Sequence, residues 1–387
     1  MKETWWIKEE QLDDDQKAFA SLGPDDSHLL IGPPGCGKTN LLLLRASYMY
    51  LAGHQNVAVL VFTRTLQEFV TQGSAAYQLP EGIVLTLNNW QWNFLRQYGA
   101  KLTPEGDTFE EKRAFAAAEV AKLIESKKIG NVYDAIFLDE AHDYLPVEIQ
   151  SFDKLGRIVT AAADIHQKLY SGEVMDDLRK IADHVHELRY HYRLGQKICR
   201  LADGVKKNSE GYLPLLPTCN YNEAARPSSV EVFSCKSLDE QVEKVLEKLQ
   251  IQLKAYPEEL IGILCPRVEE LEKMWEIVAN SEFGPIAMKQ GGGDHSRYDD
   301  SKRIHVGTIH SAKGVEFRAA HLVSIEFVSR FPYEKNMVYT AITRAKTSLS
   351  LYHAEPLPGY LRQALKGLEP LPPLLSMHEL FGKQGKG

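Results

Sequence analysis

The feature that most constrains this chain is a glycine-rich loop between an apolar run and a helical run. The apolar residues LLI lead into Gly32, and the loop GPPGCGKT ends at Thr39, where the helical run TNLLLLRASYMY begins. Glycines let successive backbone N–H groups converge on phosphate oxygens, and the N-terminus of the following helix adds a favourable field. The order strand, loop, helix therefore predicts a phosphate-binding loop in an α/β fold.

The residues of this loop have separate expected roles. Lys38 is expected to reach the β- and γ-phosphates of ATP, and the Thr39 hydroxyl is expected to bind Mg²⁺. The rest of the loop is expected to hold the phosphates through Gly32, Pro33, Gly35, Cys36 and Gly37. The alternative is a plain glycine-rich turn, which the flanking strand and helix patterns disfavour.

Two acidic residues supply a second element of the same site. Asp139 and Glu140 directly follow the apolar run AIFL, which has the pattern of a buried strand. Asp139 fits the carboxylate that holds magnesium in P-loop enzymes, and Glu140 is placed to polarise the attacking water. Such a pair is usually a surface turn, but the upstream loop favours the catalytic interpretation.

Short apolar runs alternate with longer helical patterns along the chain, which is typical of parallel α/β sheets. Strands are expected at 28–31, 57–62, 83–87, 135–139, 158–162, 230–233, 260–265, 304–308, 321–325 and 348–352. Helices are expected at 38–51, 109–126, 238–253, 269–279 and 336–346. These patterns predict two domains, 1–187 and 188–368, followed by a Pro-rich tail, 369–387.

Composition limits the classes of function. A length of 387 residues allows two medium domains, and a net charge of −7 means that a nucleic-acid site would need a local basic groove. The sequence has no apolar run long enough to cross a bilayer and no apolar signal core, so a cytoplasmic location without a membrane partner is expected. Five cysteines without a CxxC pair argue against a zinc site and a disulfide framework.

Further motifs follow in a fixed order. LDDDQKAFA precedes the loop, VFTRT and TLNNW follow it, and DEAHD, ADIHQKLY, LRYHYR, VGTIHSAKGVEF and VYTAITRAK come later. Together these motifs resemble those of superfamily 1 helicases of the UvrD/Rep type, in the family's order. The resemblance covers most of the chain. It implies two RecA-like motor domains with mostly parallel sheets and an ATP site in the cleft between them.

The resemblance also implies roles for individual residues. The nucleotide-binding set would include Gln16 at the adenine edge, Tyr192 stacked on adenine, and Glu316. Gln167 would report the state of the γ-phosphate. Arg193 and Arg344 would reach the γ-phosphate from the second domain and stabilise transition-state charge. Nucleic-acid contacts are implied for Phe62, Thr63, Trp90, Tyr170, Thr308 and His310.

Alternatives exist for several of these residues. Arg193 could form a surface salt bridge, Arg344 could be a charge on a helix face, and Trp90 is equally well explained as a core residue. The chain also departs from the family pattern at two positions. His142 stands where glutamine is usual, and His191 stands where asparagine is usual.

Two functions are consistent with these motifs. The first is an ATP hydrolase that translocates on single-stranded or partly duplex DNA, with 3′ to 5′ unwinding implied by the resemblance and RNA as an alternative strand. The second is an ATPase subunit that senses DNA or nucleotide and regulates a partner such as a nuclease, with little unwinding of its own. It is implied by a resemblance to the helicase-like subunits of phage-defence systems such as Gabija and motivated by the missing insertions, the acidic net charge and the apolar tail. A small-molecule kinase is disfavoured, since it would not need the motifs of the second half.

Overall fold

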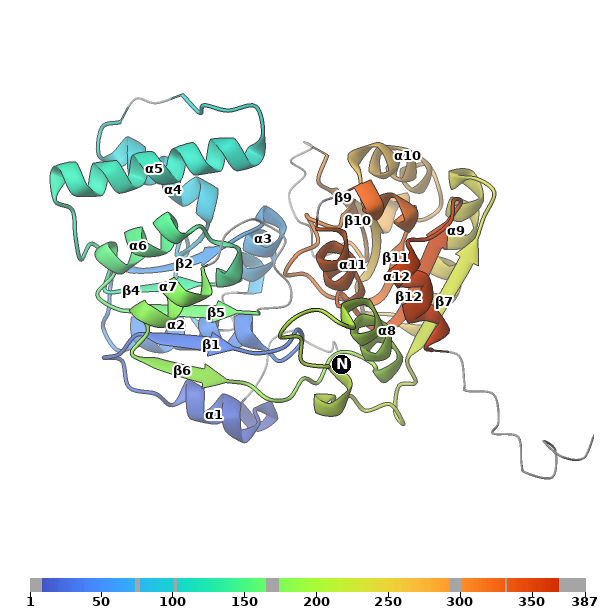
Figure 1. The fold of residues 1–387 in the computed structure, drawn as a ribbon, viewed down its shortest axis with the longest axis horizontal. Coiled ribbons are helices and arrows are strands. Elements are labelled where there is room, and N and C mark those ends of the chain that lie inside the picture. The colour runs from blue at the N-terminus through green and yellow to red at the C-terminus, as the bar shows by residue number, and fades with distance from the viewer. Residues whose placement is uncertain are drawn as a thin grey trace, which may run out of the picture.

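The computed structural model describes residues 9–73, 77–100, 103–164, 174–292, 299, 301–330 and 333–368. Two α/β units lie side by side, one from each half of the chain (Figure 1). Each unit contains a six-stranded sheet, and all ladders between the described strands are parallel. The predicted fold class, α/β with two mostly parallel sheets, is confirmed. The domain limits at 187 and 368 stay a prediction.

The first sheet has the strand order β3-β2-β4-β5-β1-β6. Its strands are β1 (His28–Ile31), β2 (Val57–Val61), β3 (Val84–Thr86), β4 (Ala135–Leu138), β5 (Val159–Ala163) and β6 (His184–Glu187). One face packs on α1 (Asp14–Ala20), α2 (Lys38–Leu51) and α3 (Arg64–Gly73). The other packs on α4 (Leu87–Gln97), α5 (Phe109–Lys127), α6 (Pro146–Leu155) and α7 (Met175–Ile181). Burial on both faces explains why the central strands are continuous apolar runs.

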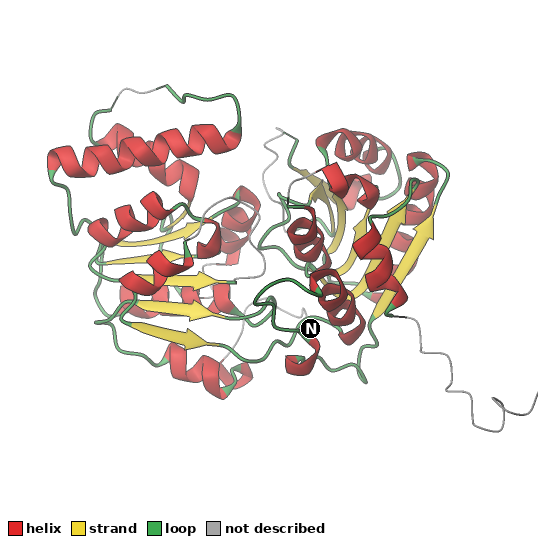
Figure 2. Ribbon diagram, in the orientation of Figure 1, coloured by secondary structure: helices red, strands yellow, loops and turns green. Residues whose placement is uncertain are grey.

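The second sheet has the order β7-β12-β11-β8-β10-β9. Its strands are β7 (Ser229–Ser234), β8 (Ile261–Cys265), β9 (Ala287–Gln290), β10 (Ile304–Thr308), β11 (Phe317–Leu322) and β12 (Ala345–His353). The helices α8 (Gln196–Lys206), α11 (Glu334–Ile342) and α12 (Gly359–Lys366) cover one face, and α9 (Leu238–Ala255) and α10 (Val268–Ala279) cover the other. Both units are therefore three-layered (Figure 2).

Each predicted strand overlaps an observed one, but some bounds are wrong. β11 begins at Phe317, four residues before the predicted start at His321. The prediction missed this stretch because Arg318 interrupts the apolar run. In the fold, Arg318 is 4% exposed and pairs with Glu259 at 2.7 Å, which makes its burial tolerable. The predicted helix 336–346 ends at Ile342, since β12 begins at Ala345.

Two strands were not predicted, β6 and β9. β6 lies at the sheet edge, and three of its four side chains are exposed, so it has no apolar run to mark it. β9 reads AMKQ and is buried despite its polar half. Lys289 there pairs with Glu272 at 2.7 Å, and Gln290 accepts from Thr65 at 3.1 Å.

Two further predictions concern ends and spans. The predicted tail 369–387 lies outside the described residues. Within the described part of the chain, no helix combines the length and apolar character that crossing a membrane requires.

Candidate active site between the two units

The phosphate loop joins β1 to α2. Gly35 and Gly37 have φ values of +75° and +88°, a left-handed conformation that favours glycine, and Gly37 is the N-cap of α2. Lys38 points back into the loop, where its Nζ donates to the carbonyl oxygens of Gly32 at 2.8 Å and Pro33 at 2.9 Å. The loop therefore has a cationic group held at its centre and backbone geometry suited to binding phosphate.

The acidic pair lies beside this loop, at the carboxyl end of β4. The Thr39 hydroxyl donates to Asp139 Oδ2 at 2.9 Å, so the two predicted metal ligands are adjacent. Burial and then the charge of Glu140 raise the pKa of Asp139. Glu140 has a φ of +49°, an uncommon backbone conformation for a residue with a side chain. Mg²⁺ prefers oxygen ligands such as hydroxyl and carboxylate groups, so Thr39 and Asp139 together fit this ion.

Residues of the second unit complete the same pocket. The first unit lines it with the phosphate loop, Asn40, Asp139 and Glu140, and the second part of the chain with Arg193, Gly314, Glu316 and Arg344. Motif residues more than 300 positions apart in the sequence, such as Lys38 and Arg344, therefore share one pocket. This arrangement matches the position expected for a nucleotide cleft.

A carboxylate organises the cations of this pocket. Glu316 accepts from Arg193 at 2.9 Å and lies 3.7 Å from Lys346 Nζ. Burial opposes the charge of Glu316, but Arg193, Lys346 and Arg344 together hold its pKa below the usual value. Burial lowers the pKa of Lys346 to about 8. Arg344 is 4% exposed and donates from Nε to Thr340 O at 3.2 Å.

A second, larger pocket of about 440 Å³ adjoins the phosphate loop and is lined by Gln16, Cys36 and Tyr192 among others. Gln16 Nε2 donates to Cys36 O at 2.9 Å, and Gln16 Oε1 accepts from Asp13 N at 3.0 Å. The Tyr192 hydroxyl donates to Asp13. The Gln16 side chain therefore supports the phosphate loop by bonding to the backbone of Cys36. The adenine contacts of Gln16 and Tyr192 stay predictions.

The residues predicted to contact nucleic acid have different surroundings. Trp90 is 3% exposed, donates to Tyr133 Oη at 3.0 Å and packs on Phe152 with ring centroids 4.7 Å apart. It lies in the core, so the prediction of Trp90 as a base-stacking residue is corrected. Phe62 is half-buried, and Arg113 Cζ lies 4.9 Å from the centroid of its ring.

The other residues that were predicted to contact nucleic acid lie near the junction of the two units or outside the described residues. Thr63 donates to Lys313 O at 3.1 Å, across the junction. The Thr308 hydroxyl accepts from Ser311 N at 3.1 Å, and burial lowers the pKa of His310. Gln167 and Tyr170 are outside the described residues.

Sequence reasoning gave no site role to Lys313, which links the two units. Lys313 and Asp143 form an ion pair in which both side chains are at most 1% exposed. His142 Nε2 lies 3.3 Å from Lys313 Nζ, and its Nδ1 accepts from Asp164 N at 3.0 Å. Burial lowers the pKa of His142 to about 3, so the ring is neutral. The sequence offered one clue to this ion pair: Asp143, the second aspartate of DEAHD, needs a cationic partner if it is buried.

Gly314 brings this linking segment against the first unit. Its φ is +83°, and a Cβ at this position would lie 2.5 Å from Leu66 Cδ2 of α3. A residue with a Cβ at this position would require the Leu66 side chain to shift and would adopt a strained backbone conformation. The geometry of the site therefore depends on the segment that contains Lys313 and Gly314.

Comparisons with known proteins extend this description. Residues 303–352 match the model of the UvrD-like helicase C-terminal domain. This segment is UvrD-like. The resemblance to UvrD/Rep-like helicases is thus confirmed, on the segment that contains Lys313, Gly314, Glu316 and Arg344.

Two solved structures are similar to the chain. One is the C-terminal domain of a possible DNA helicase from Lactobacillus plantarum, at 20% identity over 46% of this chain and 96% of that one, with a TM-score of 0.33. The other is Arterivirus nonstructural protein 10, a helicase in complex with DNA, at 15% identity over 92% of this chain and 66% of that one, with a TM-score of 0.39. No curated protein matches significantly.

Proposed function

We propose that this helicase-like chain hydrolyses ATP between its two units and uses the cycle to translocate on single-stranded DNA. The observation that carries the proposal is the shared pocket, in which the phosphate loop and the acidic pair face Arg193 and Arg344. A site divided between two units couples nucleotide binding to their relative movement, because ATP binds best when both halves are in place.

Each residue has a defined task in this proposal. Lys38 exchanges its carbonyl partners for the β- and γ-phosphates. Thr39 and Asp139 hold Mg²⁺, which when bound neutralises developing phosphate charge. Glu140 accepts a hydrogen bond from the attacking water. Arg193 exchanges Glu316 for the γ-phosphate, and Arg344 adds a second positive charge in the transition state.

The direct test is ATP turnover by the full chain with single-stranded DNA, duplex DNA, RNA or no nucleic acid, with strand separation measured in parallel. Stimulation by single-stranded DNA is expected. The Lys38→Ala variant should lack turnover, and Lys122→Ala is the matched control, since the Lys122 side chain is 74% exposed on α5. Turnover that no nucleic acid changes would refute translocation while leaving an ATPase.

A second candidate is a regulatory ATPase that gates a partner such as a nuclease. This candidate is favoured by the absence of an accessory domain among the described residues between Arg193 and β10. All helices and strands there belong to the second sheet and the helices that cover it. A cytoplasmic location is part of both proposals. Co-purification with a nuclease and no strand separation would favour this candidate, and strong unwinding by the isolated monomer would contradict it.

A further inference from the structure

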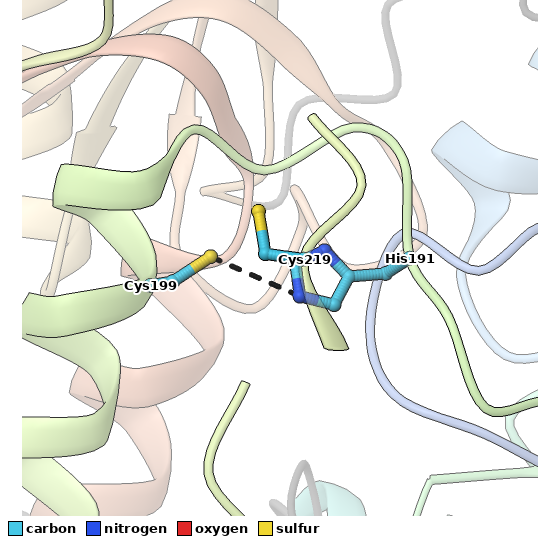
Figure 3. Close-up of side chains that lie close together, drawn as sticks. All are labelled: His191, Cys199 and Cys219. Carbon is cyan, nitrogen blue, oxygen red and sulfur yellow. Dashed lines mark hydrogen bonds between the residues drawn. The ribbon is translucent and has the colours of Figure 1, made fainter. Parts of the chain in front are cut away.

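A histidine and two cysteines from three successive segments of the second half of the chain lie close together. His191 belongs to the loop after β6, Cys199 to the first turns of α8, and Cys219 to the turn after the short 3-10 helix Leu216–Thr218. One nitrogen of the ring and both Sγ atoms lie within 4.8 Å of one another. Figure 3 shows Cys199 Sγ facing His191 Nε2, at 3.9 Å, with Cys219 beside the ring.

The backbone holds these three residues in place without any ion. His191 N donates to Thr218 O at 3.2 Å, and Asn220 N donates to His191 O at 2.8 Å, so His191 and Cys219 face each other across an isolated parallel bridge. Cys199 N donates to Gly195 O at 3.0 Å as part of α8. The cluster is thus a built feature of three segments and not a chance approach of mobile side chains.

The hydrogen bonding of the cluster is incomplete. His191 and Cys199 are fully buried, and His191 Nδ1 has no hydrogen-bond partner among the described residues. Its Nε2 lies 2.9 Å from Leu215 O, and both thiols point at one carbonyl, Leu194 O, at 3.5 Å from Cys199 and 3.2 Å from Cys219. Buried polar side-chain atoms normally have partners, and apart from each other the ring and the two thiols have only the carbonyl oxygens of Leu215 and Leu194 as acceptors in these contacts.

We propose that His191, Cys199 and Cys219 bind one thiophilic cation of the Zn²⁺ class. Imidazole nitrogen and thiolate sulfur are the ligands such ions prefer, and a Cys₂His set with a fourth position for water is an established ligand set. Bond lengths of about 2.0–2.3 Å place tetrahedral ligand atoms roughly 3.6 Å apart, close to the observed 3.9 Å between Cys199 Sγ and His191 Nε2. The other two separations are at most 4.8 Å, so binding one ion requires the three side chains to draw closer together.

The proton balance of binding is simple. The cation forms bonds to Cys199 Sγ, Cys219 Sγ and His191 Nε2, and the two thiols lose one proton each to solvent. The neutral ring keeps its proton, which moves from Nε2 to Nδ1, so ion binding replaces the contact of Nε2 with Leu215 O. The product is a neutral dithiolate complex, and two protons are released for each ion bound.

An ion bound at this cluster would affect the neighbouring pockets, because the cluster is continuous with residues that line them. Tyr192 and Arg193 directly follow His191 in the chain, and both line the pockets of the candidate active site. An ion bound to His191, α8 and the turn at Cys219 would fix the loop that presents Arg193. This consequence rests on the proposed function, but the binding of the ion does not.

The test is a titration of the full metal-free chain with Co²⁺ as the probe, without nucleotide. We expect one equivalent to give sulfur-to-cobalt charge-transfer absorption that Zn²⁺ then removes. Cys199→Ser and Cys219→Ser should each reduce this absorption, since one thiolate remains, and the apparent affinity should fall by at least about tenfold. The variant with both serines should lose the absorption. Cys235→Ser is the matched control, because Cys235 is buried after β7 and its thiol faces Phe233 O at 3.8 Å.

Two further variants keep the result interpretable. His191→Asn retains both thiols and should weaken Co²⁺ binding at least about tenfold, with circular dichroism confirming the fold. Thr39→Ala removes an expected magnesium ligand and should leave the sulfur absorption intact, so this proposal can fail or hold independently of the ATPase. No charge-transfer absorption in the wild-type chain, or absorption that survives in the variant with both serines, would overturn it.

Discussion

The two units share an architecture but divide the chemistry between them. Both are built on a six-stranded parallel sheet with helices on both faces. The first unit supplies a preformed phosphate loop with two left-handed glycines and the carboxylates at the end of β4. The second supplies cations at the pocket, Arg193 and Arg344, and contributes no phosphate loop among its described residues. In the proposed function, the first unit therefore binds the phosphates and the second adds the cations that promote turnover.

The largest effect is expected from the first unit, in Lys38→Ala. Removing the ammonium leaves the phosphates without their central cation, so turnover should be abolished and ATP binding should weaken. ATP hydrolysis assays and nucleotide titrations measure both quantities. Lys122→Ala on the exposed face of α5 should behave as wild type. Normal turnover in Lys38→Ala would remove the basis for assigning binding to the first unit.

The next effect belongs to the second unit and should differ in kind. Arg344→Ala is expected to lower kcat by roughly 1000-fold, the scale of an arginine that stabilises phosphoryl-transfer charge, with little change in ATP affinity. Arg362→Ala on α12 is the control, since Arg362 is exposed and outside the pocket. If Arg344→Ala weakens binding as much as turnover, the two units do not divide binding from catalysis.

Sequence patterns predicted the first unit's half of the site more completely than its surroundings. The loop at Gly32 and the pair Asp139–Glu140 are local, so consecutive residues carry the whole signal. The partners of Arg193 and Lys313 are set by how the units pack, which no local pattern encodes. The edge strand β6 lacks an apolar run, and Trp90 cannot be told from a stacking residue until its neighbours are known. His191, Cys199 and Cys219 were missed because their spacing follows no motif.

The ion pair between the units should have a smaller but separable effect. Lys313→Met leaves Asp143 buried and uncompensated, which typically costs about 3–5 kcal/mol of stability. Arg113→Met breaks a pair of similar burial within the first unit, where Arg113 Nε lies 3.0 Å from Glu148 Oε1. Chemical denaturation should show a loss in both variants.

The two variants should differ in function. Only Lys313→Met is expected to reduce the stimulation of ATP turnover by single-stranded DNA, because Lys313 pairs with Asp143 across the junction whereas Arg113 pairs with Glu148 within the first unit. Adding Asp143→Asn to Lys313→Met removes the uncompensated charge and should recover part of the stability. Equal loss of stimulation in Arg113→Met would mean that the pair contributes to stability alone.

The smallest effect concerns acid stability and is tested at His305 of the second unit. Burial lowers the pKa of His305 in β10 to about 3, and neither ring nitrogen has a hydrogen-bond partner among the described residues. Only the unfolded chain gains a proton as pH falls below about 6.5, so this site should cost roughly 2 kcal/mol of stability between pH 7 and pH 5. His305→Leu should abolish that loss, measured by denaturation at both pH values.

His321 is the comparison. Burial also lowers its pKa to about 3, but its ring contacts Tyr352 Oη at 2.9 Å and Gln252 Oε1 at 2.7 Å. His321→Leu should therefore reduce the loss of stability in acid and also lower the stability at pH 7. An unchanged pH dependence in His305→Leu would show that His305 is not a source of acid sensitivity in the second unit.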